Sequence, residues 1–369
     1  MGGHHPPTVH VITSSFTNRK SFAYSVRQAK SITSIVDIFH PNPPLPHSYL
    51  PLIHLTSQSR YAKMGFSPDA DIPDLSGKVI IVTGGSSGLG KESVLQLAKH
   101  NPAAIYLTAR TRARADAAIK EIEAAVPAAK DKIKFLELDL GSFASIKKAA
   151  EAFHNQSDRL DILMNNAGLM ASPPGLTTDG YEVQFGSNYM GPALLTKLLL
   201  PALEKTAAQK DGDARIINLS SELFKQAPKQ GILLSQCKTP LEEISGLARY
   251  GHSKLADYYH SRTLSQQYPA IKVVAIHPGV VNTGLFDDFR KRRPWIGALV
   301  SLAGSIFLTD VHAGARAQLW ASTTDRKNIR SGGFYNQKLT EYKEAVLGDD
   351  KAASALEAWT EKEFASHGF

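Results

Sequence analysis

The chain has 369 residues, of which 43% are hydrophobic and 21% charged, ordinary values for a globular protein with one large α/β domain or two modest domains. Its formal net charge is +8, but residues 1–63 hold six basic side chains and one acidic one, so only +3 remains for the other 306 residues. This near neutrality argues against a nucleic-acid-binding surface on the folded part of the chain. A single cysteine, Cys237, excludes an internal disulfide and favours a reducing compartment.

Residues 1–63 differ in composition from the rest, because Ser, Thr, His and Pro dominate them. Within them, residues 21–39 form a basic, Ser-rich amphipathic pattern like that of an organelle transit peptide. The alternative is a disordered tail, or upstream sequence that is not normally translated, with Met64 as the start. The first interpretation predicts a mitochondrial protein and the second, which we favour, a cytoplasmic one; in both, residues 64–369 form the folded domain. No window of 18 apolar residues predicts a membrane-spanning helix.

The glycine-rich stretch Thr83–Gly90 is the first candidate functional site. It follows the apolar run 79–82 and precedes residues 91–99, whose apolar side chains recur at a helical spacing, so we predict strand, glycine turn and helix. In such a turn the backbone approaches a pyrophosphate, which binds to the amides and the positive dipole end of the helix. The residues that we expect to hold a dinucleotide here are Gly84, Ser86, Ser87, Gly88, Leu89 and Gly90.

The end of the second predicted strand, 105–108, is where such a fold selects its dinucleotide. An acidic residue there would bind the ribose hydroxyls of NAD, whereas an arginine accommodates the 2′-phosphate of NADP. This chain has Arg110, with Arg112 and Arg114 close behind and no acidic residue before Asp116. We therefore predict NADP(H) as the cofactor. The alternative is that the three arginines form only the solvated start of a helix over 113–125.

Two further strand ends carry small or polar residues. Asp139 follows the predicted strand 133–138, at the edge where ligands bind in open α/β sheets, although it could equally cap a helix that starts at Ser142. The strand 161–164 runs into Asn-Asn-Ala-Gly at 165–168, whose small residues would let a cofactor lie close. These stretches add Asp139, Asn166, Ala167 and Gly168 to the predicted cofactor-binding residues.

The order of these motifs resembles one family. Thr-Gly-x-x-x-Gly-x-Gly from Thr83, Asp-Leu at 139–140 and Asn-Asn-Ala-Gly at 165–168 are similar to the ordered signature of the short-chain dehydrogenase/reductase superfamily, and the likeness covers about residues 75–338. The resemblance implies a Rossmann fold, and the alternation of strands and helices from Leu75 agrees with it. We predict a doubly wound, mostly parallel α/β sheet of about seven strands with helices on both faces, in a single domain.

Asn188 lies at the start of a long apolar helix that we expect to run through Leu203. Asparagine is a poor helix former, so its presence there needs a reason. The family resemblance implies that it opens the helix locally and holds a water molecule of a proton relay. The alternative is a buried amide that hydrogen-bonds a neighbouring backbone group.

Tyr250 and Lys254 stand four residues apart, so on a helix they share a face and the ammonium can lie near the phenol. A tyrosine with a pKa of about 10 is a poor proton donor or acceptor at neutral pH, and an adjacent cation brings it towards a useful range. Earlier in the chain, the predicted strand 215–221 ends in Ser220 and Ser221 at the ligand edge.

These residues predict the reduction of a carbonyl, or its reverse. Tyr250 would give a proton to the carbonyl oxygen, and Ser221 would hydrogen-bond the same oxygen as charge develops on it. Lys254 would lower the pKa of Tyr250; the resemblance adds that it holds the nicotinamide ribose and that Asn188 links it to solvent through water. Ser221 is preferred to Ser220 by similarity to the family. The alternative to an enzyme is a catalytically silent dinucleotide-binding regulatory protein.

The sixth predicted strand, 273–276, ends in the stretch His277–Thr283. Its Pro-Gly pair turns the chain sharply, and the resemblance implies that Thr283 touches the cofactor. We interpret the lone His277 as structural and predict no metal site, since no second ligand stands at a suitable spacing. The predicted cofactor-binding set is completed by Pro278, Gly279, Val281 and Thr283.

Residues 285–308 form the segment that we expect to close over the substrate. A basic run at 290–293 precedes an apolar stretch at 295–308. This stretch could be a lid over a lipophilic substrate, a peripheral contact with anionic membrane, or simply a helix packed on the domain. Beyond it, residues 331–335 predict a last strand and residues 350–364 a closing amphipathic helix.

Within the superfamily, Tyr-x-His-Ser-Lys-Leu-Ala from Tyr250, Gln-Phe-Gly-x-Asn from Gln184 and Ser-Gly-Gly-Phe-Tyr from Ser331 resemble retinol-dehydrogenase-like and protochlorophyllide-reductase-like members. Many of those proteins interconvert lipophilic alcohols and carbonyl compounds with NADP(H), so we expect a substrate of that class. Family members also often pair through the two long helices that carry Asn188 and Tyr250, which implies a homodimer or homotetramer.

Overall fold

The computed structural model describes residues 1–2, 65–281 and 309–369. The described residues from 65 onward belong to one compact unit. The predicted targeting or disordered segment beyond residue 2, the predicted lid 285–308 and the predicted cofactor contact Thr283 lie outside the described residues.

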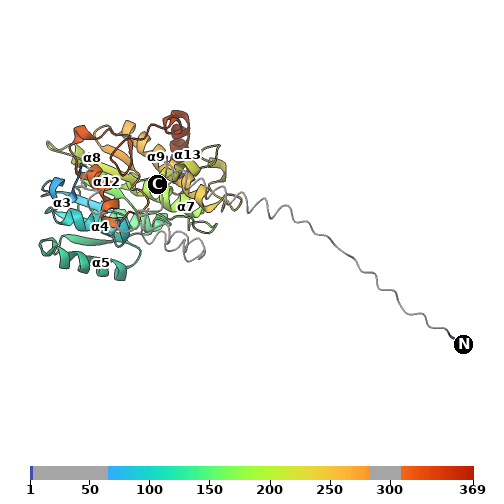
Figure 1. Ribbon diagram of the computed structural model, residues 1–369, viewed down its shortest axis with the longest axis horizontal. Coiled ribbons are helices and arrows are strands. Elements are labelled where there is room, and N and C mark those ends of the chain that lie inside the picture. Colours follow the sequence, from blue (N-terminus) through green and yellow to red (C-terminus); the bar gives the residue numbers. More distant parts are fainter. Residues whose placement is uncertain (3–64, 282–308) are drawn as a thin grey trace, which may run out of the picture. The chain divides into compact units, whose positions relative to one another are not determined.

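Seven parallel strands form one sheet in this unit (Figure 1). Their order across the sheet is β3-β2-β1-β4-β5-β6-β7, so the chain builds outward from β1 to β3 and then crosses back to β4. The order reverses between β1 and β4, and the carboxyl ends of these two strands are therefore where a ligand-binding crevice is expected. The prediction of a doubly wound parallel sheet is confirmed. The strands are β1 (Val79–Val82), β2 (Ala104–Ala109), β3 (Ile133–Glu137), β4 (Ile162–Asn165), β5 (Arg215–Leu219), β6 (Lys272–Ile276) and β7 (Phe334–Tyr335).

Helices cover both faces of the sheet. Ile80 and Ile105 are buried with residues of α4, α5 and α12, whereas Ile81 and Tyr106 are buried with residues of α6, α8 and α9. Successive side chains of a strand point to opposite faces, so central strands that are buried on both sides read as continuous apolar runs. The longer helices are α4 (Gly88–Ala98), α5 (Arg112–Ala125), α6 (Phe143–His154), α8 (Gly191–Ala207), α9 (Gly246–Gln267), α12 (Val311–Thr323) and α13 (Asp350–Ser366). The shorter ones are α3 (Pro68–Asp71), η2 (Pro127–Ala129), α7 (Val183–Phe185), η3 (Gly186–Met190), η4 (Glu222–Gln226), η5 (Leu234–Gln236), η6 (Arg326–Asn328) and η7 (Ala345–Gly348).

One predicted helix cap is wrong. Ser142, not Asp139, is the N-cap of α6, and its Oγ accepts a hydrogen bond from the backbone N–H of Ser145 at 3.3 Å. Asp139 instead closes a turn, since its Oδ1 accepts a hydrogen bond from the backbone N–H of Gly141 at 2.9 Å. The chain makes this extra turn between β3 and α6, so the strand end and the helix cap are different residues.

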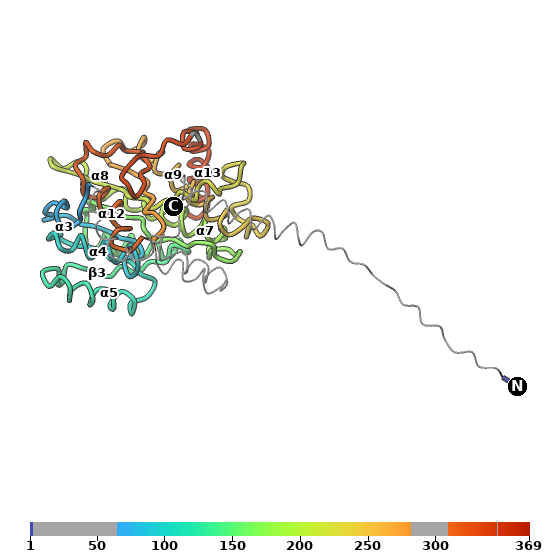
Figure 2. The backbone as a smooth tube through the Cα atoms, viewed as in Figure 1, coloured from blue at the N-terminus to red at the C-terminus, as the bar shows by residue number. Residues whose placement is uncertain are grey.

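The C-terminal helix α13 packs along α9 (Figure 2). The hydroxyl groups of Thr360 and Tyr189 are 2.6 Å apart, and a Lys197–Glu361 ion pair at 2.5 Å ties α13 to α8. Part of the outer surface of the two long helices is therefore already covered by this chain itself.

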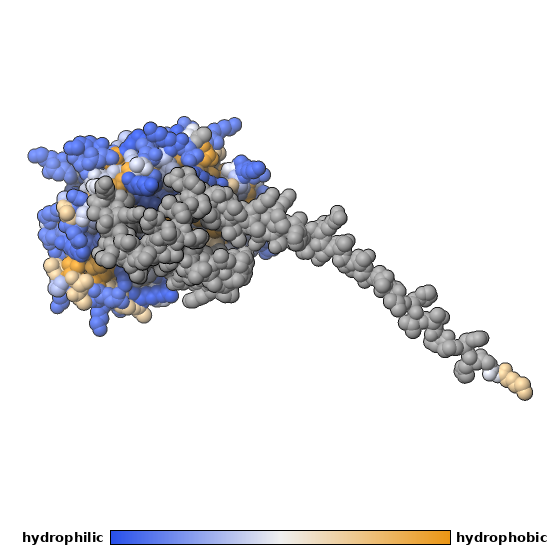
Figure 3. Space-filling view, viewed as in Figure 1, coloured by the Kyte–Doolittle hydropathy of each residue, from blue (hydrophilic) through white to orange (hydrophobic). Residues whose placement is uncertain are grey.

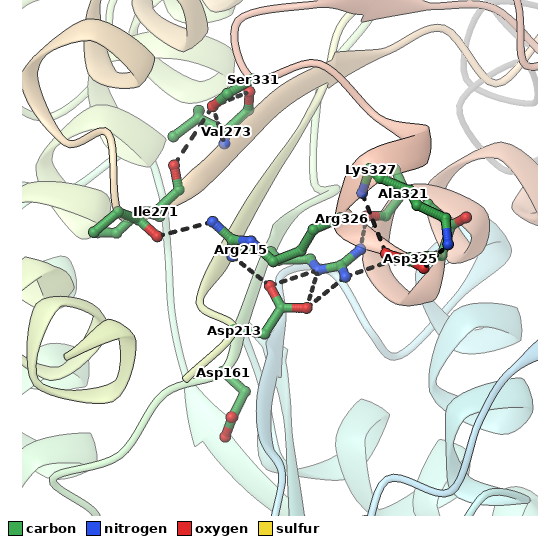
Figure 4. A network of polar contacts seen from close by, with 12 residues as sticks. Asp161, Asp213, Arg215, Ile271, Val273, Ala321, Asp325, Arg326, Lys327 and Ser331 are labelled. Carbon is green, nitrogen blue, oxygen red and sulfur yellow. Dashed lines mark hydrogen bonds and ion pairs between the residues drawn. The ribbon is translucent and has the colours of Figure 1, made fainter. Parts of the chain in front are cut away.

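Ion pairs hold the amino ends of β4 and β5 (Figure 4). The guanidinium groups of Arg215 and Arg326 both face Asp213, and Arg326 donates to its Oδ1 at 2.6 Å. Asp161, just before β4, accepts two hydrogen bonds of 2.7 Å from Arg159. We call this group of residues the amino-edge network.

The described surface in view is mainly hydrophilic (Figure 3). Among the described residues, the exposed large hydrophobic side chains are Met1, Leu176 and Val346. None of the described helices combines the length and the apolar composition that a membrane crossing requires.

Candidate active site

The glycine turn between β1 and α4 has a backbone shape that glycine adopts easily and other residues do not. Gly84 and Gly88 have φ angles of +65° and +52°. A Cβ atom on Gly90 would lie 2.4 Å from the carbonyl oxygen of Gly84, so the turn and the first turn of α4 touch through their backbones. The motif therefore combines two positive-φ positions with one close backbone approach.

The start of α4 is open to an external acceptor. Ser87 occupies its N-cap position and makes no side-chain capping hydrogen bond. The first amides of a helix have no partner within the helix, and the positive end of the helix dipole adds to their attraction for anions. Ser86 is half-buried and Ser87 exposed. This cradle fits the pyrophosphate of a dinucleotide.

Thr83 joins the glycine turn to the predicted Asn-Asn-Ala-Gly segment at the end of β4. Its Oγ1 accepts hydrogen bonds from the backbone N–H groups of Asn166 at 2.9 Å and Ala167 at 3.0 Å. In return, Nδ2 of Asn166 donates to the backbone carbonyl of Thr83 at 2.8 Å. The two segments at the point where the strand order reverses are thus one hydrogen-bonded unit.

A residue from α12 also reaches this unit. Nε2 of Gln318 donates to Oγ of Ser93 at 2.6 Å and to Oδ1 of Asn166 at 3.3 Å. A Cβ atom on Gly314 would lie 2.5 Å from Val281 and 2.9 Å from Leu89, so these two predicted cofactor residues meet at α12. The sequence did not point to Gln318, because 225 residues separate it from Ser93 and 152 from Asn166.

The catalytic candidates Ser221, Tyr250 and Lys254 come together at the carboxyl ends of β5 and β6. Tyr250 and Lys254 lie on α9, and Lys254 Nζ is 5.7 Å from the centre of the Tyr250 ring. All three side chains are buried. Ser221 is the N-cap of η4 and hydrogen-bonds Tyr250, whereas Oγ of Ser220 donates to the carbonyl of Lys254 at 2.7 Å. Of the two serines, Ser221 is therefore the one that faces the phenol.

The pKa of Tyr250 lies above its ordinary value. Burial raises it, and this effect outweighs the opposing effects of the Lys254 ammonium and the hydrogen bond from Ser221. We expected the neighbouring cation to bring the phenol towards a useful range. In the protein without cofactor, that cation offsets only part of the cost of burying a phenolate.

Lys254 has a carboxylate partner that the sequence analysis missed. Its Nζ donates to Oδ2 of Asp257 at 2.8 Å and to the backbone carbonyl of Leu219 at 2.7 Å. Burial alone would lower the pKa of Lys254, but the charges of Asp257 and Tyr250 outweigh it and raise the pKa. The signal was available, because residues three apart on a helix share a face.

Asn188 lies in η3, a π-helical turn that leads into α8. Its side chain bonds the backbone of Leu169 in both directions, accepting from the N–H at 2.7 Å and donating to the carbonyl at 2.9 Å. It also donates to Oγ of Ser253 at 2.9 Å. The helix is locally widened here, as the family resemblance implied. The amide also hydrogen-bonds the backbone of a neighbouring segment, as the alternative interpretation of a buried amide predicted.

Gly168 lies close to the catalytic candidates. A Cβ atom there would be 3.3 Å from Oδ1 of Asn188 and 3.7 Å from Nζ of Lys254. The segment that binds the glycine turn through Thr83 therefore also borders Lys254. Contacts therefore connect the glycine turn, the segment from Asn166 to Gly168, and Lys254 along the carboxyl edge of the sheet.

The remaining predicted cofactor residues lie at the ends of β2, β3 and β6. Arg110 and Asp139 are exposed, and Pro278 and Gly279 are half-buried, with Gly279 at a φ of +90°. Arg112 forms a 2.8 Å ion pair with Asp116 on α5. Arg112 is therefore engaged within α5, whereas Arg110 directly follows β2.

The histidines near the site and the cysteine are not suited to catalysis. Burial lowers the pKa of His252 and of His277 to about 4 each, which keeps both neutral. Nε2 of His252 accepts a hydrogen bond from the backbone of Leu233. Burial raises the pKa of the Cys237 thiol well above its ordinary value. In the described ranges, no group of three or more His, Cys, Asp or Glu side chains is arranged as metal ligands.

Comparison with known proteins agrees with this geometry. The chain is 40% identical over 273 residues to an uncharacterized oxidoreductase of Schizosaccharomyces pombe, an alignment that covers 72% of this chain and 78% of that protein. It is 34% identical over 268 residues to an oxidoreductase of Neurospora crassa that is named as mitochondrial, which covers 70% of this chain and 65% of that protein.

Solved structures share the fold. The NADPH-bound carbonyl reductase from chicken fatty liver superposes with a TM-score of 0.54 at 25% identity, over 73% of this chain and all of that one. A protein from Mycobacterium paratuberculosis superposes with a TM-score of 0.62 at 25% identity, over 81% of this chain and 97% of that one. The sequence profile of the short chain dehydrogenases matches residues 78–294, more than half of the chain. With this match, the relatives and the doubly wound sheet in agreement, the chain belongs to the short chain dehydrogenase family of oxidoreductases.

Proposed function

We propose that the chain is an NADP(H)-dependent oxidoreductase that interconverts a lipophilic alcohol and its ketone or aldehyde, with Tyr250 as the general acid and base. The observation that carries this proposal is the buried group of Tyr250, Ser221 and Lys254. It borders Gly168, which belongs to the segment bonded to the glycine turn.

The residues at the carboxyl edge fit a dinucleotide. The glycine turn and the open amides of α4 would hold its pyrophosphate, and the exposed Arg110 would pair with a 2′-phosphate. Asn166, Ala167 and Gly168, with Pro278, Gly279 and Val281, would line the rest of the binding site. When bound, the nicotinamide supplies or accepts the hydride.

The chain's own residues would handle the proton. In reduction, negative charge builds on the carbonyl oxygen, and Tyr250 gives that oxygen its proton while Ser221 hydrogen-bonds it. Lys254 stabilises the phenolate that remains, and its ammonium is held by Leu219 and Asp257. Oxidation of the alcohol runs through the same groups in reverse.

The preference for NADP(H) rests on Arg110. It is exposed at the end of β2, and Arg112 is engaged with Asp116. We expect Arg110→Asp to weaken NADPH binding by about tenfold or more, because a repelling charge replaces an attracting one. Fluorescence titration with NADPH and NADH measures this, with Arg114→Asp as the control. An unchanged preference would refute the role of Arg110 and not the reaction.

The compartment and the membrane contact are separate proposals, each with its own test. We propose a cytoplasmic protein, with mitochondrial import as the alternative that the named Neurospora relative supports. N-terminal sequencing of the protein from cell fractions decides between them. Peripheral contact with anionic membrane through residues 285–308 is tested by flotation with anionic vesicles.

For assembly we propose a homodimer or homotetramer in which α13 is part of the contact, since α13 packs on α9 and is tied to α8. Sedimentation of the full chain tests this directly. A monomer at all concentrations would contradict it.

The function itself is tested with the purified full chain. Loss of NADPH absorbance is followed across a panel of apolar aldehydes, ketones and quinones, beside Tyr250→Phe. Turnover that disappears in the variant supports the mechanism. NADPH binding without turnover on any panel member would favour the regulatory, non-catalytic alternative.

A further inference from the structure

A buried carboxylate, that of Asp257, contacts Lys254 of the proposed Tyr250–Lys254 pair. Asp257 lies on α9, three residues after Lys254, and the side chains of Lys254 and Asp257 are 5% and 7% exposed. An ammonium group has three N–H bonds. In Lys254 one is directed to Asp257 and another to the carbonyl of Leu219, so the position of Nζ is set by α9 and the end of β5 together.

We propose that Asp257 is a positioning residue for the Tyr250–Lys254 pair, and that its charge sets the pH at which this pair gives up a proton. The inference rests on the proposed function, in which Tyr250 and Lys254 act together. It adds a third member to the pair, one that acts through Lys254 and not on the substrate.

The direction of the effect follows from the sign of the charge. A carboxylate attracts the ammonium proton of Lys254 and repels the phenolate of Tyr250, so it favours the protonated form of both groups. Burial raises the pKa of Tyr250 and lowers that of Lys254, and Asp257 adds an upward effect to each. Because the two groups lie close together, their proton losses belong to the pair. Removing the carboxylate must then move the first loss to lower pH.

The groups that face Asp257 come from three elements. Lys254, Tyr250 and His260 lie on α9, Tyr189 lies on η3, and Glu357 of α13 is 3.5 Å from His260. Burial raises the pKa of Asp257 to about 6, against the opposing effects of Lys254 and His260. The 2.8 Å contact with Nζ of Lys254 is the one that a carboxylate makes with an ammonium group.

The test uses two neutral variants of the full chain, Asp257→Asn and Asp257→Ser. Two readouts are recorded against pH. One is kcat/KM for alcohol oxidation, which needs the deprotonated pair. The other is the tyrosinate absorbance of the cofactor-free protein minus that of Tyr250→Phe, over the range where circular dichroism reports an intact fold. We expect both curves to move to lower pH by about one unit, a typical shift for the loss of one neighbouring charge.

The matched control is Asp213→Asn, which removes a carboxylate from the amino-edge network. Its curves should stay at the wild-type pH. Curves that do not move in the Asp257 variants, or that move to higher pH, would overturn the proposal. Loss of folding in both neutral variants would also overturn it, in favour of a purely structural ion pair.

The two readouts separate this inference from the proposed function. The absorbance titration needs neither substrate nor cofactor. A shift in absorbance without turnover on any substrate would keep the role of Asp257 in the pair and reject the proposed reaction. Turnover with unshifted pH curves would support the proposed reaction and reject the role of Asp257 in the pair.

Discussion

The pKa values of two carboxylates, one near each edge of the sheet, are shifted in opposite directions. At the amino edge, Asp213 is buried in part, yet its pKa is lowered, because the hydrogen bonds and charges of Arg215 and Arg326 outweigh the cost of burial (Figure 4). At the carboxyl edge, Asp257 has one lysine as its ion-pair partner, and burial raises its pKa to about 6. The partners of Asp213 therefore more than offset the cost of burying its charge. The partner of Asp257 offsets only part of that cost.

Polar satisfaction differs in the same direction. The two guanidinium groups that face Asp213 also donate to backbone carbonyls, Arg215 to Ala321 and Arg326 to Ala270. Among the described residues, Nδ1 of His277 and Oε1 of Gln318, towards the carboxyl edge, are buried without a hydrogen-bond partner, whereas the charged side chains of the amino-edge network have partners. Buried polar groups normally find partners, so incomplete satisfaction is typical of a site that binds something. The comparison supports the proposal that the carboxyl edge carries the reaction, whereas the amino-edge network stabilises the fold.

The largest expected effect is at the carboxyl edge. Tyr250→Phe should lower turnover by about a thousandfold, since it removes the proton donor and leaves the packing of the ring. NADPH affinity and thermal stability should change little. Steady-state kinetics, fluorescence titration and calorimetry measure the three quantities. Activity within a factor of ten of the wild type would remove Tyr250 from the reaction.

The next effect concerns the glycine turn. Gly90→Ala places a Cβ atom 2.4 Å from the carbonyl oxygen of Gly84 and 2.6 Å from Nδ2 of Asn166, so the cradle must open. We expect NADPH to bind about a hundredfold more weakly. Gly175→Ala is the matched control, because nothing lies within 4 Å of its Cβ position. Equal affinity in the two variants would mean that the turn does not hold the dinucleotide.

The amino edge should respond in stability and not in catalysis. Asp213→Asn leaves Arg215, which is buried, without its carboxylate, and should lower the free energy of unfolding by about 2 kcal/mol. The five residues of β5 separate this pair from Ser221 by roughly 17 Å at about 3.3 Å per residue. Denaturant titration should therefore show a lower free energy of unfolding, whereas kcat should be unchanged. A parallel fall in kcat would break the distinction between the two edges.

The last effect is a difference in pH dependence. The pKa of Asp257 is raised in the folded state, so its contribution to stability is most favourable below the unfolded value near 4 and is lost as the pH rises through about 6. Asp213, whose pKa is lowered, contributes stability above the unfolded value that is lost as the pH falls below it. Between pH 4 and 7, Asp257→Asn should flatten the decline in unfolding free energy by about 2 kcal/mol, since each unit between the folded and unfolded pKa values corresponds to about 1.4 kcal/mol. A slope equal to that of the wild type would count against the raised pKa.

Much of this protein could be predicted from the sequence because the signals are local. Apolar runs marked the strands, and the steric demands of Gly84, Gly88 and Gly90 act within one turn of chain. The positions of Tyr250 and Lys254 on one helix face follow from a spacing of four. These features depend on neighbouring residues, so they can be read before the fold is known.

Other features were decided by the tertiary structure alone. Ser221 faces Tyr250 while Ser220 bonds the backbone of Lys254, a distinction that depends on how β5 packs on α9. Gln318 reaches Asn166 because α12 packs against α4 and β4. The direction of the pKa shift of Tyr250 is set by burial, which exceeds the effect of the neighbouring cation. Burial and contacts between distant segments depend on the whole chain, and that is why the sequence determined which residues are the catalytic candidates and only the fold determined their environment.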